Sequence, residues 1–253
     1  MDAYVNCTIE NGLAIIRFYH PAHNSLPGFL LKDLAHKITE AGENPQVKII
    51  LIQSAGDKTF CAGASFDELS NIQDIETGKI FFMGFAHVIL AMRNCSKLIL
   101  GRIQGKAIGG GVGLAAAMDY PMATQYASIR LSELAVGIGP FVIGPAVERK
   151  MGAAAFQMMA MNPTEWQTAQ WAKQKGLFYE VFDTIEQLDL YQQKFITQLL
   201  EYNPEALHML KKIFWEGTPD WEQKLIERAG ISGRLVLSEI SKKAIYQFKQ
   251  NKN

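Results

Sequence analysis

The chain has 253 residues, of which 48% are hydrophobic and 20% are charged, and its 25 basic and 25 acidic residues leave no formal net charge. This length and composition suit one sizeable globular domain with a buried core. The charge balance lacks the basic excess that marks nucleic-acid-binding proteins, so no nucleic-acid partner is expected.

The cysteines and the apolar runs indicate the cellular compartment of the protein. The three cysteines, Cys7, Cys61 and Cys95, have no metal-ligand spacing and predict reduced thiols rather than disulfides or a metal site. No apolar run has the length of a membrane span, and residues 1–4 lack the features of a signal peptide. We therefore expect a cytoplasmic protein without a metal or a membrane partner.

Strand-like and helix-like patterns alternate over the first part of the chain. Helical periodicity predicts helices over residues 29–41 and 80–93, and the small, apolar residues 113–118 are also compatible with a helix. Short β-branched or apolar runs predict strands over residues 47–52, 98–103 and 122–130. This alternation is typical of an α/β layered fold.

From about Thr184 onward the sequence is compatible with helix almost throughout. Asn203-Pro204, Gly217-Thr218-Pro219 and Gly230 are expected to separate the helices. The helices are predicted over residues 186–202, 204–215, 221–231 and 237–249. We expect an α/β core over residues 1–190 and a C-terminal helical region over residues 191–253.

The loop at residues 58–65 follows a predicted strand and a turn. Its small residues Ala62, Gly63, Ala64 and Ser65 would let a ligand approach the backbone closely. Small-residue loops are common, so this segment alone is a weak indication of a binding site.

Three consecutive glycines, Gly109, Gly110 and Gly111, open a small-residue helix after the predicted strand at residues 98–103. The first N–H groups of a helix have no partner within it, and the helix dipole is positive there, so this end could hold a phosphate or an oxyanion. The segment has neither the ending of a P-loop nor the pattern of a dinucleotide-binding loop. Close helix packing is the alternative explanation of the glycines.

Glu133 lies in an apolar stretch, residues 132–140. An isolated glutamate usually faces solvent. If this one is buried, the loss of solvation would raise its pKa and suit its carboxyl group to proton transfer.

These three segments, in this order and spacing, together with Asn24-Ser25-Leu26, resemble the crotonase (enoyl-CoA hydratase/isomerase) superfamily over nearly the whole chain. The resemblance implies a spiral of ββα units and a C-terminal helical region that packs in trimers, often paired into hexamers. It also implies an acyl-CoA substrate, held while its thioester becomes an enolate, and no cofactor beyond the coenzyme A that belongs to the substrate.

The resemblance assigns roles to particular residues. The two oxyanion-hole donors fall on the backbone N–H groups of Ala62 and Gly110. Glu133 matches the second of the family's two catalytic glutamates. The residues expected to line the path of the acyl-CoA are Gly63, Ala64, Ser65 and Gly109.

The chain departs from the hydratase pattern at Gly113, which stands where hydratases carry their first catalytic glutamate. Dienoyl-CoA isomerases carry aspartates at the positions of Gly113 and Phe141. The remaining pattern is similar to Δ3,Δ2-enoyl-CoA isomerases, in which one glutamate moves a proton from C2 to C4. The alternatives are a hydratase with an unidentified second group, acting on a branched substrate such as methylglutaconyl-CoA, a non-catalytic acyl-CoA-binding protein, and thioester hydrolysis or decarboxylation.

Other polar and aromatic residues are expected to be exposed or to have structural roles. Asp67 is expected to face solvent, Trp166 to pack in the core or against a helix, and Cys61 to be a small buried thiol. The histidines show no ligand spacing and are expected to be structural or exposed; they are His20, His23, His36, His87 and His208.

Overall fold

The computed structural model describes residues 2–250, so the outermost residues of the two predicted regions, 1 and 251–253, lie outside the described part. The strands are β1 (Tyr4–Glu10), β2 (Leu13–Tyr19), β3 (Ile49–Ser54), β4 (Thr59–Cys61), β5 (Leu98–Ile103), β6 (Lys106–Ile108), β7 (Tyr120–Thr124), β8 (Ile129–Arg130) and β9 (Glu180–Phe182). They form a six-stranded sheet in the order β1-β2-β3-β5-β7-β9 and a three-stranded sheet in the order β4-β6-β8.

Each repeating unit supplies one strand to each sheet. The pairs β3-β4, β5-β6 and β7-β8 do so in turn, and within each sheet their strands run parallel. The expected spiral of ββα units is confirmed. The helices are α1 (Gly28–Glu43), α2 (Phe66–Ser70), α3 (Ile75–Asn94), α4 (Gly110–Ala117), η1 (a 3-10 helix, Glu133–Val136), α5 (Gly144–Met151), α6 (Ala153–Met161), α7 (Ala169–Gln174), α8 (Ile185–Glu201), α9 (Pro204–Phe214), α10 (Trp221–Leu235) and α11 (Glu239–Gln250).

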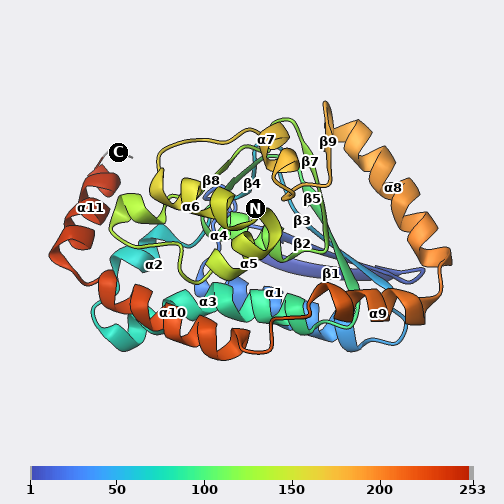
Figure 1. Ribbon diagram of the computed structural model, residues 1–253, viewed down its shortest axis with the longest axis horizontal. Helices are drawn as coiled ribbons and strands as arrows, with labels where there is room; N and C mark the ends of the chain where they lie inside the picture. The colour runs from blue at the N-terminus through green and yellow to red at the C-terminus, as the bar shows by residue number, and fades with distance from the viewer. Residues whose placement is uncertain (1, 251–253) are drawn as a thin grey trace.

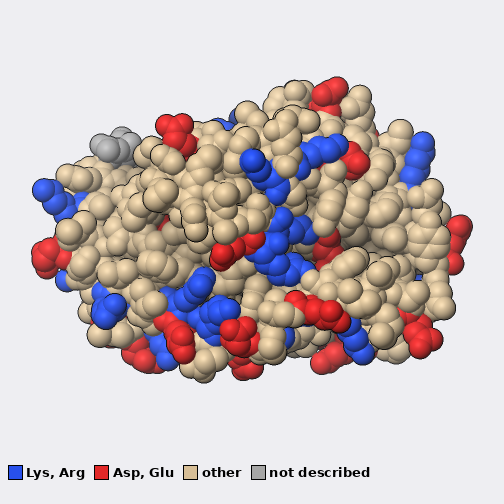
Figure 2. Space-filling model, viewed as in Figure 1, with Lys and Arg blue, Asp and Glu red and all other residues tan. Residues whose placement is uncertain are grey.

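The large sheet is covered on both faces, because successive side chains of a strand point to opposite sides. On β3, Ile50 and Ile52 join the main core with α1 and α3, whereas Ile49 and Leu51 pack with Leu188 of α8 and other residues of α8 and α9. Figure 1 shows α1, α3 and α10 along one long side of the molecule and α8 standing apart from them. On the face seen in Figure 2, basic and acidic side chains are intermixed rather than gathered at separate poles.

By length and composition alone, helix α3 is long and apolar enough to cross a membrane. The prediction that no apolar run has the length of a membrane span missed this helix. In this fold α3 packs against α1, α4 and α10. A Cβ atom added to Gly78 of α3 would lie 2.9 Å from the Cα atom of Gly233 on α10. The two helices therefore touch backbone to backbone, as packed helices of a core do.

Three sequence predictions need correction. The strand expected over residues 122–130 is two strands, β7 and β8, which belong to different sheets. Gly230 does not end a helix but lies inside α10, which continues to Leu235. Helix α8 runs through residue 190, so the chain has no structural break at the expected boundary between core and helical region.

A hairpin, β1-β2, opens the large sheet and was not predicted. Its turn residues Asn11 and Gly12 both have positive φ, 49° and 86°. An Asn-Gly pair is the preferred sequence for such a two-residue turn, so the signal was present in the sequence.

The helical tail is tied to the spiral by the buried carboxylate of Asp119. Its Oδ2 accepts hydrogen bonds from the backbone N–H of Ile99 and from Nζ of Lys211, both at 2.7 Å, and its Oδ1 accepts one from Nε1 of Trp215 at 2.9 Å. The side chains of Lys211 and Asp119 are only 2% and 3% exposed. Removing one partner would leave the other charge buried without compensation.

We expect Asp119→Ala to lower the free energy of unfolding by about 3–5 kcal/mol, since it strands the Lys211 ammonium group. Urea denaturation followed by circular dichroism measures the loss. Glu180→Ala is the control, because it breaks the half-exposed pair of Lys173 and Glu180, which should matter by about 1 kcal/mol or less. Equal losses in the two variants would contradict the role given to Asp119.

Candidate active site

A cavity of about 780 Å³ lies between the small sheet, the start of α4, η1 and α11. It brings together every residue that the sequence singled out for the site. These are Ala62, Gly63, Ala64, Ser65, Gly109, Gly110 and Glu133.

The two predicted oxyanion segments meet at the floor of this cavity. A Cβ atom on Gly63 would lie 3.0 Å from the carbonyl oxygen of Ile108 and 3.5 Å from the backbone nitrogen of Gly110, and Gly63 has a φ of +89°. A Cβ on Gly110 would collide with the ring of Phe85. Glycine at these positions therefore permits both the turn and the close approach of the segments.

Among the described residues, neither of the two proposed donor N–H groups is used in a hydrogen bond within the protein. Within residues 2–250, the N–H groups of Ala62 and Gly110 donate to no protein acceptor. Gly110 is the first residue of α4, where the N–H has no intrahelical partner and the dipole is positive. Gly109, the preceding residue, is fixed by a hydrogen bond from its N–H to the carbonyl oxygen of Arg130 at 2.8 Å. Two free donors on neighbouring segments can serve one oxygen atom that gains negative charge.

The carboxyl group of Glu133 lies beside Gly109, the residue that precedes the proposed donor Gly110. A Cβ atom on Gly109 would lie 2.9 Å from Oε1 of Glu133, so the missing side chain of Gly109 leaves the space that the carboxyl group fills. Oε2 is buried and has no hydrogen-bond partner among the described residues. Burial without a counter-charge raises the pKa of Glu133 from its ordinary 4.5 to about 7. A carboxyl group with this pKa can both take and return a proton near neutral pH.

Gly113 has no space for a side chain. A Cβ atom there would lie 2.5 Å from Cγ2 and 2.7 Å from Cβ of Ile143, just before α5. The place where a hydratase-type first glutamate would begin is therefore filled by an aliphatic side chain. The sequence showed that Gly113 lacks the carboxylate found there in hydratases. It could not show that the side chain of Ile143 fills the space.

Aromatic and aliphatic side chains that the sequence did not assign form the apolar wall of the cavity. They come from α3, from the segment after η1 and from α11. Helix α11 packs against η1 and α2, and the hydroxyl of Ser241 donates to the carbonyl oxygen of Gly137 at 3.0 Å. The wall residues include Phe81, Phe82, Phe85, Phe141, Val142, Ile143 and Phe248.

Trp166 lines the cavity and is 37% exposed, so the expectation that it packs in the core is wrong. The guanidinium carbon of Arg130 lies 4.4 Å from the centre of the Trp166 ring, and Nζ of Lys106 lies 5.2 Å from it. Nε of Arg130 is buried and unpartnered within the described residues. These two cations therefore give one part of the cavity a positive charge that suits an anionic portion of a ligand.

His23 is exposed and His20 makes local hydrogen-bond contacts with Ala22 and Ser25, as the structural or exposed roles predicted for them imply, and both also line the cavity. Asp67 is exposed, as predicted, and lies at the cavity as well. Cys61 is a fully buried free thiol whose pKa desolvation raises to about 12, so its predicted role as an inert small residue is confirmed.

The sequence matches the family model of the enoyl-CoA hydratase/isomerase proteins over residues 8–252. Crotonyl-CoA hydratase of Syntrophomonas wolfei subsp. wolfei is 29% identical over 141 residues, which cover 54% of this chain and 54% of that relative. The peroxisomal bifunctional enzyme of Homo sapiens is 31% identical over 132 residues, covering 52% of this chain and 17% of that protein. The matched segments thus span about half of these relatives or less.

Solved structures share the fold along nearly the whole chain. Enoyl-CoA hydratase from Bacillus halodurans superposes with a TM-score of 0.88 at 21% identity, covering 96% of this chain and 99% of that one. An enoyl-CoA hydratase from Shewanella pealeana gives a TM-score of 0.78 at 26% identity, covering 98% and 94% of the two chains. The first likeness, at its low identity, concerns the fold alone.

Because the pKa of Glu133 is raised, the free energy of unfolding should depend on pH. The folded protein holds a proton on Glu133 up to about pH 7, whereas the unfolded chain releases it near pH 4.5. The stability linked to this proton is fully present below pH 4.5 and is lost as the pH rises through 7. Relative to wild type, Glu133→Gln should therefore gain up to about 3 kcal/mol between pH 4 and pH 8.

Urea denaturation of both proteins across this pH range measures the difference between them, in which the other titrating groups cancel. A difference that stays constant with pH would show that the Glu133 carboxyl group is well solvated.

Proposed function

The chain belongs to the enoyl-CoA hydratase/isomerase family, and on that premise we propose that it moves the double bond of a 3-enoyl-CoA to give the 2-enoyl-CoA. Glu133 acts as the single proton shuttle in this proposal. The N–H groups of Ala62 and Gly110 hold the thioester oxygen, and the small residues around them line the path of the substrate.

One structural observation supports isomerisation rather than hydration. The carboxyl group of Glu133, with its buried Oε2, lines the same cavity as Ala62 and Gly110 and lies beside Gly109, while Ile143 fills the space at Gly113 where a second carboxylate would begin. Adding water to a double bond requires that a water molecule be both held and activated, which two carboxylates do readily. Moving a double bond requires only one group that takes a proton and returns it, and Glu133 suffices for that.

The proposed reaction balances without a further reagent. Glu133 takes a proton from C2, and the electron pair of that C–H bond delocalises into the thioester carbonyl to give a dienolate. The oxygen gains negative charge between the N–H groups of Ala62 and Gly110, each of which can contribute about 3 kcal/mol to its stabilisation. Glu133 then returns the proton to C4, and the double bond lies between C2 and C3.

Hydration is the second candidate, and the names of the relatives favour it, since two of them are called crotonyl-CoA hydratase and short-chain-enoyl-CoA hydratase. In that case another cavity group must orient the water with Glu133. Among the described residues, Asp67, His20 and His23 are the other acidic or imidazole side chains that line the cavity.

We also propose that the protein works in the cytoplasm as a homotrimer or hexamer. Assembly is supported by large apolar side chains that the single chain leaves exposed on its C-terminal helices. On α9 and α11 these are Met209, Leu210, Ile213, Phe214, Ile240 and Tyr246.

The substrate is tested by giving the purified protein 3-enoyl-CoA and 2-enoyl-CoA separately and identifying the products by mass and ultraviolet absorbance. We expect conversion of 3-enoyl-CoA and no water addition to 2-enoyl-CoA. Glu133→Gln should reduce turnover by at least about 10²-fold, the contribution of a positioned acid–base group. Water addition as the main reaction, or full turnover by Glu133→Gln, would refute the assignment.

Gly113→Glu should not create hydratase activity, because the new side chain meets Ile143. Even Gly113→Ala should lower the free energy of unfolding by about 1–3 kcal/mol through overpacking. Gly230→Ala is the matched control, since a Cβ atom there meets nothing within 4 Å and alanine favours helix by about 1 kcal/mol. The denaturation midpoints of the two alanine variants are compared with that of the wild type. A Gly113→Ala protein as stable as wild type would contradict the predicted clash with Ile143.

A further inference from the structure

A second cavity, of about 450 Å³, shares no lining residue with the first. It lies over β2, β3 and β5 on the face of the large sheet that α8 covers, and α8 supplies its outer wall with Asp189 and Gln192. Its polar residues stand at the carboxyl ends of these three parallel strands. Ligands of open α/β sheets bind preferentially outside the carboxyl ends of the strands.

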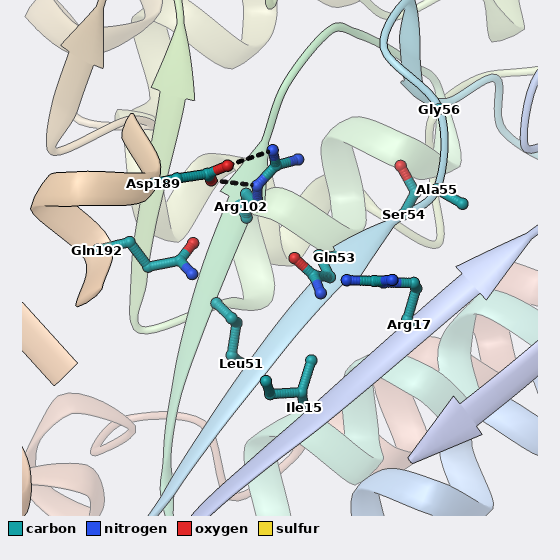
Figure 3. A pocket seen from close by; sticks show the side chains of 10 residues that line it. All are labelled: Ile15, Arg17, Leu51, Gln53, Ser54, Ala55, Gly56, Arg102, Asp189 and Gln192. Atoms are coloured by element: carbon teal, nitrogen blue, oxygen red, sulfur yellow. Dashed lines mark hydrogen bonds and ion pairs between the residues drawn. The ribbon is translucent and has the colours of Figure 1, made fainter. Parts of the chain in front are cut away.

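Three polar side chains form one row across the strands. Arg17 of β2 is in register with Gln53 of β3, and Gln53 is in register with Arg102 of β5. With its amide oxygen turned toward Arg17, Gln53 accepts hydrogen bonds from Nε at 3.1 Å and from Nη2 at 2.8 Å. In this orientation the amide nitrogen of Gln53 takes the position that Figure 3 draws as its oxygen, on the side of the amide turned away from Arg17, and can act as a donor there.

The positive charge of this row is only partly neutralised. Asp189 pairs with Arg102 through two hydrogen bonds, Nε to Oδ1 at 2.6 Å and Nη2 to Oδ2 at 3.0 Å. Nη1 of Arg102 remains on the side turned away from Asp189 (Figure 3). Within the described residues, no carboxylate pairs with Arg17. The cavity therefore carries one net positive charge from its two arginines and one aspartate.

One acceptor in the cavity also lacks a partner. The side-chain oxygen Oε1 of Gln192 is buried and has no hydrogen-bond partner among the described residues. Figure 3 shows the Gln192 amide pointing into the cavity toward Gln53. A buried acceptor without a donor is unfavourable by about 1–3 kcal/mol, so a ligand that brings a donor relieves this deficit.

We propose that this cavity binds a small anion, a carboxylate or a phosphate that also carries a hydroxyl group, between Arg17 and Arg102. The anion accepts from the free N–H groups of both guanidinium forks and from the Gln53 amide. Its hydroxyl group donates to Oε1 of Gln192. Guanidinium groups suit carboxylate and phosphate oxygens in particular, because their planar N–H donors match the spacing of those oxygens.

The test is isothermal titration calorimetry of the full chain with glycolate, glycerol phosphate and inorganic phosphate, at constant ionic strength set with sodium chloride. Each titration is run without coenzyme A and with saturating coenzyme A. Arg17→Gln and Gln192→Leu remove the proposed contacts. Arg234→Gln is the control, an exposed arginine on α10 away from the cavity.

We expect glycolate or glycerol phosphate to bind, and the comparison of these two shows whether the anion is a carboxylate or a phosphate. Glycerol phosphate should bind more tightly than inorganic phosphate if the phosphate is preferred, because only it brings an alcohol hydroxyl to Gln192. Arg17→Gln and Gln192→Leu should each weaken binding about tenfold, as loss of one such hydrogen bond implies. Arg234→Gln should leave binding unchanged.

Two results would overturn the proposal. Binding by none of the probes, or equal binding by Arg17→Gln and wild type, would leave the row of arginines with a purely structural role in holding α8. Loss of probe binding when coenzyme A is present would make the sites a single one rather than two.

Discussion

The candidate site depends on the close approach of two backbone segments, which only residues without side chains permit. Gly63 follows β4 and faces Ile108 and Gly110, which end β6 and begin α4. A methyl group at Gly63 or Gly110 would push the segments apart or strike the ring of Phe85. Because an oxyanion is stabilised only by donors held at hydrogen-bond distance, the spacing of these segments decides whether the site can work.

The same constraint places Glu133, the base of the proposed reaction. Gly109 leaves the space that the carboxyl group of Glu133 fills, and the N–H of Gly109 binds the carbonyl oxygen of Arg130, three residues before Glu133. The proposed donors and the proposed base thus follow adjacent strands of one small sheet, β4-β6-β8. Since this sheet arises from the second strand of successive ββα units, the spiral fold itself brings the three segments together.

The sequence predicted what local patterns encode. The long helices, the buried strands, the glycine-rich start of α4 and the three site segments all have signals within a few residues, and the Asn11-Gly12 turn had one that was overlooked. The sequence could not predict contacts between distant residues. The filling of the space at Gly113 by Ile143, and the placement of Arg130 beside Trp166, depend on packing between elements far apart in the chain. The division of residues 122–130 between two sheets is likewise decided by their partners, β5 and β6.

In the proposed reaction Glu133 and the two backbone donors together generate an enolate, and proton exchange tests this step without requiring a particular product. A saturated acyl-CoA has exchangeable hydrogens at C2 but no double bond to move or hydrate. Incubated with the protein in deuterium oxide, it should gain deuterium at C2, as followed by nuclear magnetic resonance, and Glu133→Gln should abolish the exchange. Exchange at equal rates in wild type and Glu133→Gln, or no exchange in wild type while the ester binds, would contradict the account.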